Sequence, residues 1–138
     1  MSVEVDVVYE GELRCSAVHK PSQNQIFTDA PVDNHGKGEA FSPTDLVATA
    51  LGSCVMTIVG IVADRHEIDL QGSKIKVAKH MVSEPVRRIG RLDVNVHFAH
   101  FVEDAHKSRL IRAAETCPVK QSLHPDIDVT IQFHWNNG

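Results

Sequence analysis

The sequence predicts an α+β fold in which antiparallel sheets pack around long buried helices. Three observations support this prediction. The longest apolar run, residues 42–66, has the length and the start signal of a helix. Segments of alternating apolar residues, which are typical of half-buried strands, lie before and after it. A second helical pattern covers residues 103–116, so helices and strands share one core without the strict alternation of a parallel α/β domain.

The segment 42–66 begins with a capping box. Ser42 can accept a hydrogen bond from a free first-turn N–H, Pro43 suits the first helical position, and Asp45 completes the S-x-x-D pattern. The residues that follow are apolar or small on every side, so we expect this helix to be buried on every side. Its apolar length of about 18 residues touches the lower limit for a membrane span. Internal glycines and hydroxyls, with an aspartate near each end, disfavour that alternative.

Six strands and one short helical turn complete the prediction. The final strand is the clearest, because apolar and polar residues alternate without interruption. The polar, glycine-containing segment 30–41 is predicted to be a loop that leads into the long helix. A helix that is apolar all round needs more cover than one sheet supplies, so we expect a second copy of the chain to complete the core. The strands are expected at residues 2–9, 13–19, 25–29, 73–81, 89–98 and 127–135, and the helical turn at 117–123.

Length and composition limit the classes of protein to consider. The 138 residues suit a single domain, 1–138. A formal net charge of -4, with scattered lysines and arginines, offers no basic surface for nucleic acid. No charged segment followed by an apolar run opens the sequence, so we expect a cytoplasmic protein without a signal peptide. Three cysteines are an odd number, which disfavours a structural disulfide framework.

Each cysteine has a structural and a chemical interpretation. Cys54 lies in the middle of the apolar helix, where a thiol is most often a small core side chain. Cys117 precedes Pro118 at a helix start, where free N–H groups would favour a thiolate, although the residue could equally be a cap without chemistry. Cys15 shares a strand face with Leu13 and Ala17, and we expect it to be a core residue.

The nine histidines do not predict a metal site. His97 and His100 lie three apart on an expected strand and would point to opposite faces. No cluster of histidine, cysteine and acidic residues has the spacing of zinc ligands, so no metal is predicted. The sequence also lacks a phosphate-binding loop, a dinucleotide fingerprint and a Gly-x-Ser-x-Gly turn, so no cofactor is expected and a serine hydrolase is disfavoured.

Two cysteine motifs carry a resemblance to a known family. The sequences SPTDLVATALGSC at 42–54 and CPVKQSLHPDIDV at 117–129 are similar to those of the OsmC/Ohr family of cysteine-dependent hydroperoxide reductases. The opening strands and the Gly-Lys-Gly loop fit as well, so the resemblance covers nearly the whole chain, which looks like a divergent OsmC-like branch. It implies an intertwined homodimer in which each long helix is shared with the sheets of the partner.

The resemblance also implies an antioxidant, peroxiredoxin-like activity in the oxidative stress response. By that resemblance, Cys54 is the peroxidatic thiol that attacks an organic hydroperoxide and becomes a sulfenic acid. Cys117 is the resolving thiol that closes a disulfide, which a dithiol of the lipoyl type then reduces. No other cofactor is implied.

Family members activate the attacking thiol with an arginine and a glutamate. In this sequence Thr44 stands at the glutamate position and Asp45 follows it, while Arg14 and Lys37 are the candidate cations. Phe41, Thr44 and Asp45 at the junction of loop and helix are the expected substrate-binding residues. The altered activating residues leave two alternatives open: a binding module that holds a hydrophobic ligand at the dimer interface, and a structural dimer with inert thiols.

Overall fold

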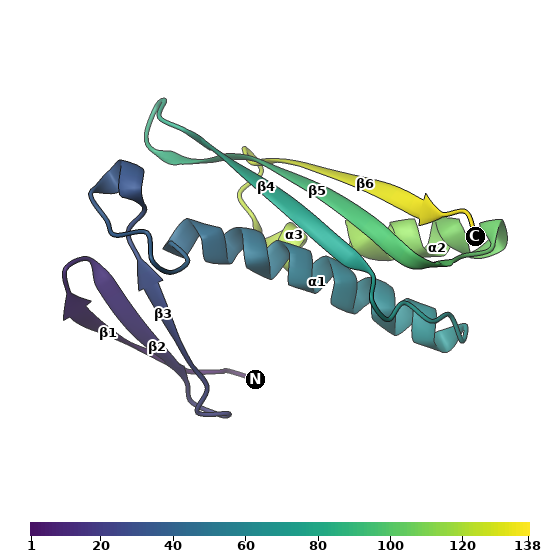
Figure 1. The fold of residues 1–138 in the computed structure, drawn as a ribbon, viewed down its shortest axis with the longest axis horizontal. Coiled ribbons are helices and arrows are strands. Elements are labelled where there is room, and N and C mark those ends of the chain that lie inside the picture. The colour runs from purple at the N-terminus through teal and green to yellow at the C-terminus, as the bar shows by residue number, and fades with distance from the viewer. The chain divides into compact units, whose positions relative to one another are not determined.

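The computed structural model describes residues 1–138 and confirms the predicted α+β order of elements (Figure 1). The chain divides into two compact units, Met1–Val47 and Ala48–Gly138, and the single domain expected over 1–138 stays a prediction. The elements are β1 (Val5–Gly11), β2 (Arg14–His19), β3 (Gln25–Asp29), the 3₁₀ turn η1 (Val32–Asn34), α1 (Pro43–Arg65), β4 (Lys74–Val82), β5 (Arg88–Phe101), α2 (Asp104–Glu115), α3 (Pro118–Ser122) and β6 (Asp128–Asn136).

The first unit contains an antiparallel sheet in the order β1-β2-β3. The reversal between β1 and β2 uses three successive residues with positive φ, of which Gly11 adopts 89° without a steric cost. The sequence predicts that β1 buries one face. In the structure β1 is exposed on both faces, and Val7 and Tyr9 are each 63% exposed. The prediction fails within one chain because the first unit has no helix that covers this sheet.

The second unit contains a sheet in the order β4-β5-β6. β4 and β5 form the predicted antiparallel hairpin, but β5 and β6 run parallel, which corrects the expectation of purely antiparallel sheets. The reason lies in the connection, because α2 and α3 stand between these strands and return the chain to the end of the sheet where β5 began. Cys117 therefore lies within a crossover connection rather than in a hairpin loop.

Helix α1 is buried along one side only, which corrects the expectation of burial all round. The opposite side carries Ala50, Ser53, Thr57 and Ile61, all exposed, with Ile61 at 45%. One chain thus covers half of an apolar helix. By length and composition α1 is the one helix that could cross a membrane, and 33% of its most apolar window is buried. The buried residues are Ala48, Leu51, Gly52, Val55, Val59 and Ala63.

The buried side of α1 packs closely against the sheet of the second unit. A Cβ atom at Gly52 would lie 3.0 Å from Cγ2 of Val77 and 3.5 Å from Cγ2 of Ile75, both on β4. The absence of a side chain at Gly52 favours this close approach, because a Cβ atom there would require Val77 to give way slightly. The position of Cys54, two residues further along the helix, depends on this contact. Fully buried apolar side chains of the second unit include Leu51, Val55, Val59, Leu92, Val94, Val96 and Leu110.

Candidate functional site

Two cysteines that lie 63 positions apart in the sequence come together in the second unit. Cys54 lies in the middle of α1 and is half-buried, whereas Cys117 precedes α3 and is fully buried. Their side chains lie close enough for Cys54 to raise the pKa of Cys117. Both are free thiols in the structure. The packing of α1 and the crossover connection thus create a local pair of sulfur atoms.

Cys117 caps the short helix α3, as its position before Pro118 predicts. Its Sγ accepts a hydrogen bond of 3.3 Å from the backbone N–H of Lys120. The expectation that this environment favours a thiolate is wrong, because burial raises the pKa of Cys117 by more than the backbone N–H groups lower it. The adjacent Cys54 raises the pKa of Cys117 further, since two thiolates side by side would repel each other. Cys117 therefore keeps its proton at neutral pH.

Arg14 belongs to the first unit and forms a bidentate ion pair. Its Nε lies 2.7 Å from Oδ1 of Asp29, and one terminal nitrogen lies 2.8 Å from Oδ2. Asp29 is only 2% exposed and also accepts the backbone N–H of Glu39 at 3.1 Å. The hydrogen bonds from Arg14 hold the pKa of Asp29 below its ordinary value, and the carboxylate raises the pKa of Arg14. The guanidinium is therefore permanently charged and fixed in direction.

Lys37 has a weaker partner in the same unit. Its Nζ lies 2.6 Å from Oε2 of Glu12, and the contact raises the pKa of Lys37 and lowers that of Glu12. The two side chains are 47% and 78% exposed, so water and salt screen their attraction. Of the two candidate cations, Arg14 is the one that the structure holds in place.

The predicted capping box at the start of α1 is present. Oγ of Ser42 accepts the N–H of Asp45 at 3.1 Å, and the Asp45 carboxylate accepts the N–H of Ser42 at 3.0 Å. Oγ1 of Thr44 lies 3.3 Å from the Ser42 hydroxyl. Phe41 is 54% exposed beside this cap. Asp45 thus has a structural role, and substrate binding by Phe41, Thr44 and Asp45 stays a prediction.

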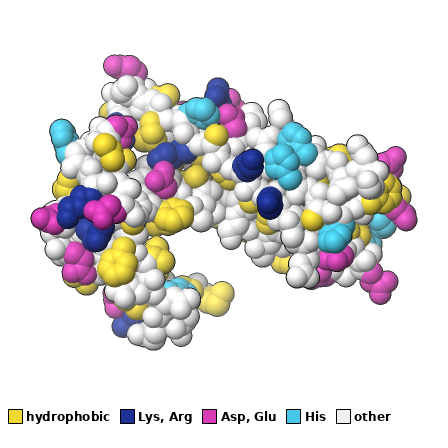
Figure 2. All heavy atoms as spheres, in the orientation of Figure 1, with side chains coloured by type: hydrophobic (Ala, Val, Ile, Leu, Met, Phe, Trp, Pro, Cys, Tyr) yellow, Lys and Arg dark blue, Asp and Glu magenta, His cyan; other side chains and the backbone are white.

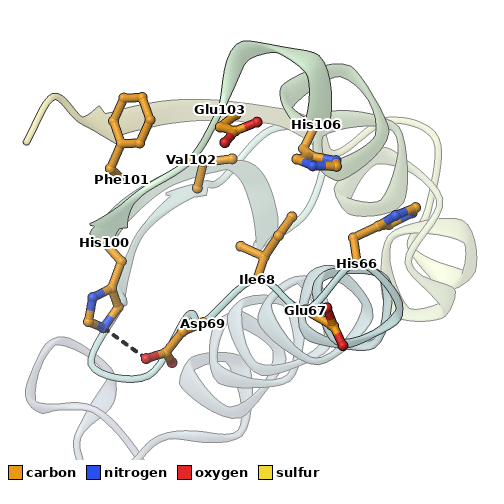
Figure 3. Close-up of a pocket in the computed structure, with 9 residues that line it drawn as sticks. All are labelled: His66, Glu67, Ile68, Asp69, His100, Phe101, Val102, Glu103 and His106. Carbon is orange, nitrogen blue, oxygen red and sulfur yellow. Dashed lines mark ion pairs between the residues drawn. The ribbon is translucent and has the colours of Figure 1, made fainter.

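A separate pocket of about 290 Å³ lies where α1 ends and α2 begins (Figure 3). His66 and His106 face each other at one end of it, with ring centroids 5.3 Å apart. Arg109 donates to Nδ1 of His106 at 2.6 Å, which requires that nitrogen to be unprotonated. At the other end His100 pairs with Asp69 at 3.6 Å. Neither cysteine of the thiol pair lines this pocket.

The chain holds no group of three or more histidine, cysteine or acidic side chains that could bind a metal ion. His66 and His106 lie close together, but they do not belong to any such group. The chemistry that the second unit can offer at the thiol pair is therefore that of sulfur atoms and the backbone groups around them.

Comparison with known proteins identifies a family that this chain matches. Residues 36–132 match the family model described as OsmC-like protein, which is more than half of the chain. The chain belongs to the OsmC-like protein family. The matched range contains both motifs on which the sequence resemblance was based. No curated protein matches the chain.

Solved structures support the OsmC-like fold over the whole chain. A protein of Psychrobacter arcticus 273-4, described as an osmotic stress induced and detoxification response protein, has 48% identity and a TM-score of 0.90, with 94% of each chain covered. An organic hydroperoxide resistance protein OsmC of Legionella pneumophila has 15% identity and a TM-score of 0.77, with 97% of each chain covered. An organic hydroperoxide resistance protein of Vibrio cholerae has 17% identity and a TM-score of 0.75, over 96% of this chain and 91% of that one.

The sequence reasoning missed Asp29, the buried partner of Arg14 in this OsmC-like chain. The two residues are direct neighbours in the register of β2 and β3. The sequence did contain a signal for this contact. If β2 and β3 pair as antiparallel strands, an arginine at the start of the first lies opposite an aspartate at the end of the second.

We expect Asp29→Asn to destabilise the first unit in a pH-dependent way. The pKa of Asp29 is lowered in the folded chain, so its contribution is present above the unfolded pKa of about 3.9 and is lost as pH falls through the folded pKa. Urea unfolding should show a lower midpoint for the variant at neutral pH and a smaller difference in acid. Asp6→Asn, at an exposed pair with Lys20, is the control and should change little. An equal deficit at all pH values would contradict the assignment.

We expect Cys117 to react slowly in the native chain. In a Cys15→Ser, Cys54→Ser variant, iodoacetamide should label Cys117 about tenfold more slowly than in the same variant unfolded in urea, because burial limits access and thiolate formation. The pH midpoint of native labelling should also lie above that of the unfolded thiol. A variant that keeps only the half-buried Cys15 is the control. Equal rates in native and unfolded protein would show that Cys117 is accessible.

Proposed function

We propose that this OsmC-like protein reduces organic hydroperoxides with the thiol pair Cys54 and Cys117. The observation that supports the proposal is their proximity, which brings together residues from α1 and from the β5–β6 crossover. Membership of the OsmC-like family supports a role in the peroxide or redox stress response. The names of the Legionella and Vibrio structures, both organic hydroperoxide resistance proteins, agree with this substrate class.

The different burial of the two thiols supports their division of labour. Cys54 is half-buried and can be reached by a small peroxide, whereas Cys117 is fully buried. Burial raises the pKa of Cys117, which makes this thiol the less suitable of the two for attack as a thiolate. Cys54 is therefore the proposed attacking sulfur and Cys117 the proposed resolving thiol.

The proposed reaction balances with the groups named. The Cys54 thiolate attacks one peroxide oxygen, the O–O bond breaks, and the alcohol leaves with a proton while Cys54 becomes a sulfenic acid. The Cys117 sulfur then attacks the Cys54 sulfur and displaces the hydroxyl as water, which forms a disulfide. An external dithiol, lipoyl-type in our proposal, reduces the disulfide by exchange and is itself oxidised.

The proposal keeps Arg14 as the cation that favours the Cys54 thiolate. Asp29 holds its guanidinium in a fixed direction, whereas the exposed Lys37 is held only by the exposed Glu12. Phe41, Thr44 and Asp45 remain the proposed substrate contacts at the start of α1. Since the proposed reductant and the reduced thiols belong to a reducing compartment, we propose a cytoplasmic location.

We also propose that the chain acts as a homodimer. The exposed side of α1 carries small residues, and the β1–β3 sheet exposes apolar side chains on both faces. Soluble monomers rarely expose so many neighbouring apolar residues. A second copy that covers the sheet and the open side of α1 would remove these surfaces from water. The exposed side chains on the sheet are Val5, Val7, Val8, Tyr9, Ile26 and Phe27.

We expect substoichiometric cumene hydroperoxide to consume two thiols per peroxide in the reduced wild type, because the disulfide uses both sulfurs. Cys54→Ser should lose no thiols rapidly, and Cys117→Ser should lose one and accumulate a sulfenic acid that dimedone traps. Free thiols are counted with a chromogenic disulfide before and after peroxide addition. Arg14→Gln should slow the thiol loss about tenfold or more through a smaller thiolate fraction.

Cys15→Ser is the matched control, because it removes a half-buried thiol outside the pair and should leave the thiol loss unchanged. No thiol loss in the wild type would contradict the proposal. If the wild type and the Cys54→Ser, Cys117→Ser variant both retained a hydrophobic ligand tightly without thiol loss, the binding-module alternative would replace it.

We expect sedimentation analysis to show a dimer that depends on the β1–β3 sheet. Val7→Lys places a charge on the exposed apolar face and should weaken dimerisation about tenfold or more, because an unpaired charge would be buried. Val86→Lys changes a residue of similar exposure, 61%, in the turn before β5 and should leave the dimer intact. A monomeric wild type at micromolar concentration would contradict the proposal.

A further inference from the structure

The outer face of the β4–β5–β6 sheet carries four nitrogen-bearing side chains at one corner. Lys74 on β4 is the direct neighbour of His97 on β5, which in turn is the neighbour of His134 on β6. Lys76 follows on the same face of β4. Both lysines are exposed, and neither forms an ion pair. We call these four residues the basic corner.

Figure 2 shows two basic side chains beside histidine side chains on this face, with no acidic side chain between them. The acidic side chain nearest along β5 is Asp93, and it is already satisfied. Its carboxylate lies 3.0 Å from His80 and 3.1 Å from Arg91, and it accepts the hydroxyl of Thr130 at 2.9 Å. The positive charges of the basic corner therefore lack an internal counter-charge.

The two histidines are arranged as a stacked pair. Their ring centroids are 4.4 Å apart and their planes differ by 8°. His134 donates from Nε2 to Oδ1 of Asn95 at 2.8 Å, which fixes its orientation. His97 has no hydrogen-bond partner for its side chain. One imidazole with two available nitrogen atoms thus lies beside two unpaired ammonium groups.

We propose that the basic corner binds a small ligand that carries two adjacent phosphate groups. Lys74 and Lys76 are two positions apart along a strand, which is about 7 Å, and the histidine pair lies on the neighbouring strands, which are about 5 Å apart. One phosphate group cannot contact all four side chains, whereas a diphosphate can place one phosphate near each end. The phosphate oxygens accept hydrogen bonds that ammonium and imidazole groups donate.

The surroundings favour a small ligand over a long polyanion. The net charge of the chain is -4, and Asp128 on β6 lies on the same face beside Arg91. A nucleic acid or an acidic protein surface would extend beyond the basic corner and meet these carboxylates. A diphosphate group is short enough to lie entirely within the basic corner. This inference is independent of the thiol chemistry, since none of the three cysteines belongs to the sheet face involved.

Protonation of the histidines should be coupled to binding. His97 faces Lys74 and Lys76 from β4 and His134 from β6, while Asp93 on its own strand is engaged by His80, Arg91 and Thr130. Burial, His134 and Lys76 all lower the pKa of His97 in the free chain. A bound anion opposes these effects and stabilises the imidazolium. Binding should therefore strengthen as pH falls from about 7.5 to about 5.5.

Titration calorimetry of the reduced full-length chain with inorganic diphosphate tests the proposal, at low salt and with a chelator present. We expect saturable binding that Lys74→Gln, Lys76→Gln weakens about tenfold or more. Lys20→Gln, Lys107→Gln is the control with the same charge change, because these lysines already pair with Asp6 and Asp104. The affinity of this control variant for diphosphate should lie within about twofold of the wild-type affinity.

His97→Gln provides a second test that does not depend on net charge at neutral pH. It should bind like the wild type near pH 7.5 and lose most of the gain in affinity at lower pH. A nucleoside diphosphate used in parallel distinguishes free diphosphate from a ligand with an organic group, since tighter binding of the nucleoside form indicates contacts beyond the phosphates. Absence of saturable binding, or equal weakening in both lysine double variants, would overturn the proposal.

Discussion

The close contact between α1 and the β4–β5–β6 sheet is the constraint on which the rest of the second unit depends. One side of the helix is apolar and narrow enough to lie directly on the strands, with Gly52 at the point of nearest approach. This contact fixes the height of Cys54 above the sheet. Cys117 belongs to a later part of the chain. It lies in the crossover between the parallel strands β5 and β6, and this crossover brings it close to Cys54 on α1. The positions of both cysteines therefore depend on how this core packs.

A single copy of the chain leaves many apolar side chains exposed to water. Its second unit has a fully buried core, while the open side of α1 and the β1–β3 sheet expose side chains that would be buried in most globular proteins. The polar groups of the first unit are nevertheless ordered, since Arg14 and Asp29 form a bidentate pair and Ser42 and Asp45 cap the helix reciprocally. Ordered polar contacts beside exposed apolar side chains are expected where another protein chain covers the surface.

Local patterns predicted the elements well, because each depends on neighbours in the sequence. The capping box and the alternation of the final strand gave α1 and β6 within one or two residues. The direction of β6 relative to β5 was not predictable in the same way, since strand pairing depends on where the intervening helices return the chain. The burial of β1 failed for a different reason. Alternation shows that one face should be covered but does not show which chain covers it.

The site was predicted in part for the same physical reasons. The helix start before Pro118 predicted the hydrogen bond to the Cys117 sulfur, but not that desolvation would outweigh it in setting the pKa. Desolvation depends on residues from distant parts of the chain, and so does the pairing of Arg14 with Asp29. Cations and thiols can be listed from a sequence, whereas their partners follow only from register and packing.

The absence of a side chain at position 52 has an evolutionary consequence. The Cβ atom of an alanine there would lie 3.0 Å from Cγ2 of Val77, so that side chain would have to give way by a few tenths of an ångström. A homologous chain with a larger residue there could keep both cysteines in its sequence and still space their sulfur atoms differently. The size of the residue at position 52 is therefore informative about the geometry of the thiol pair, although this residue carries no reactive group.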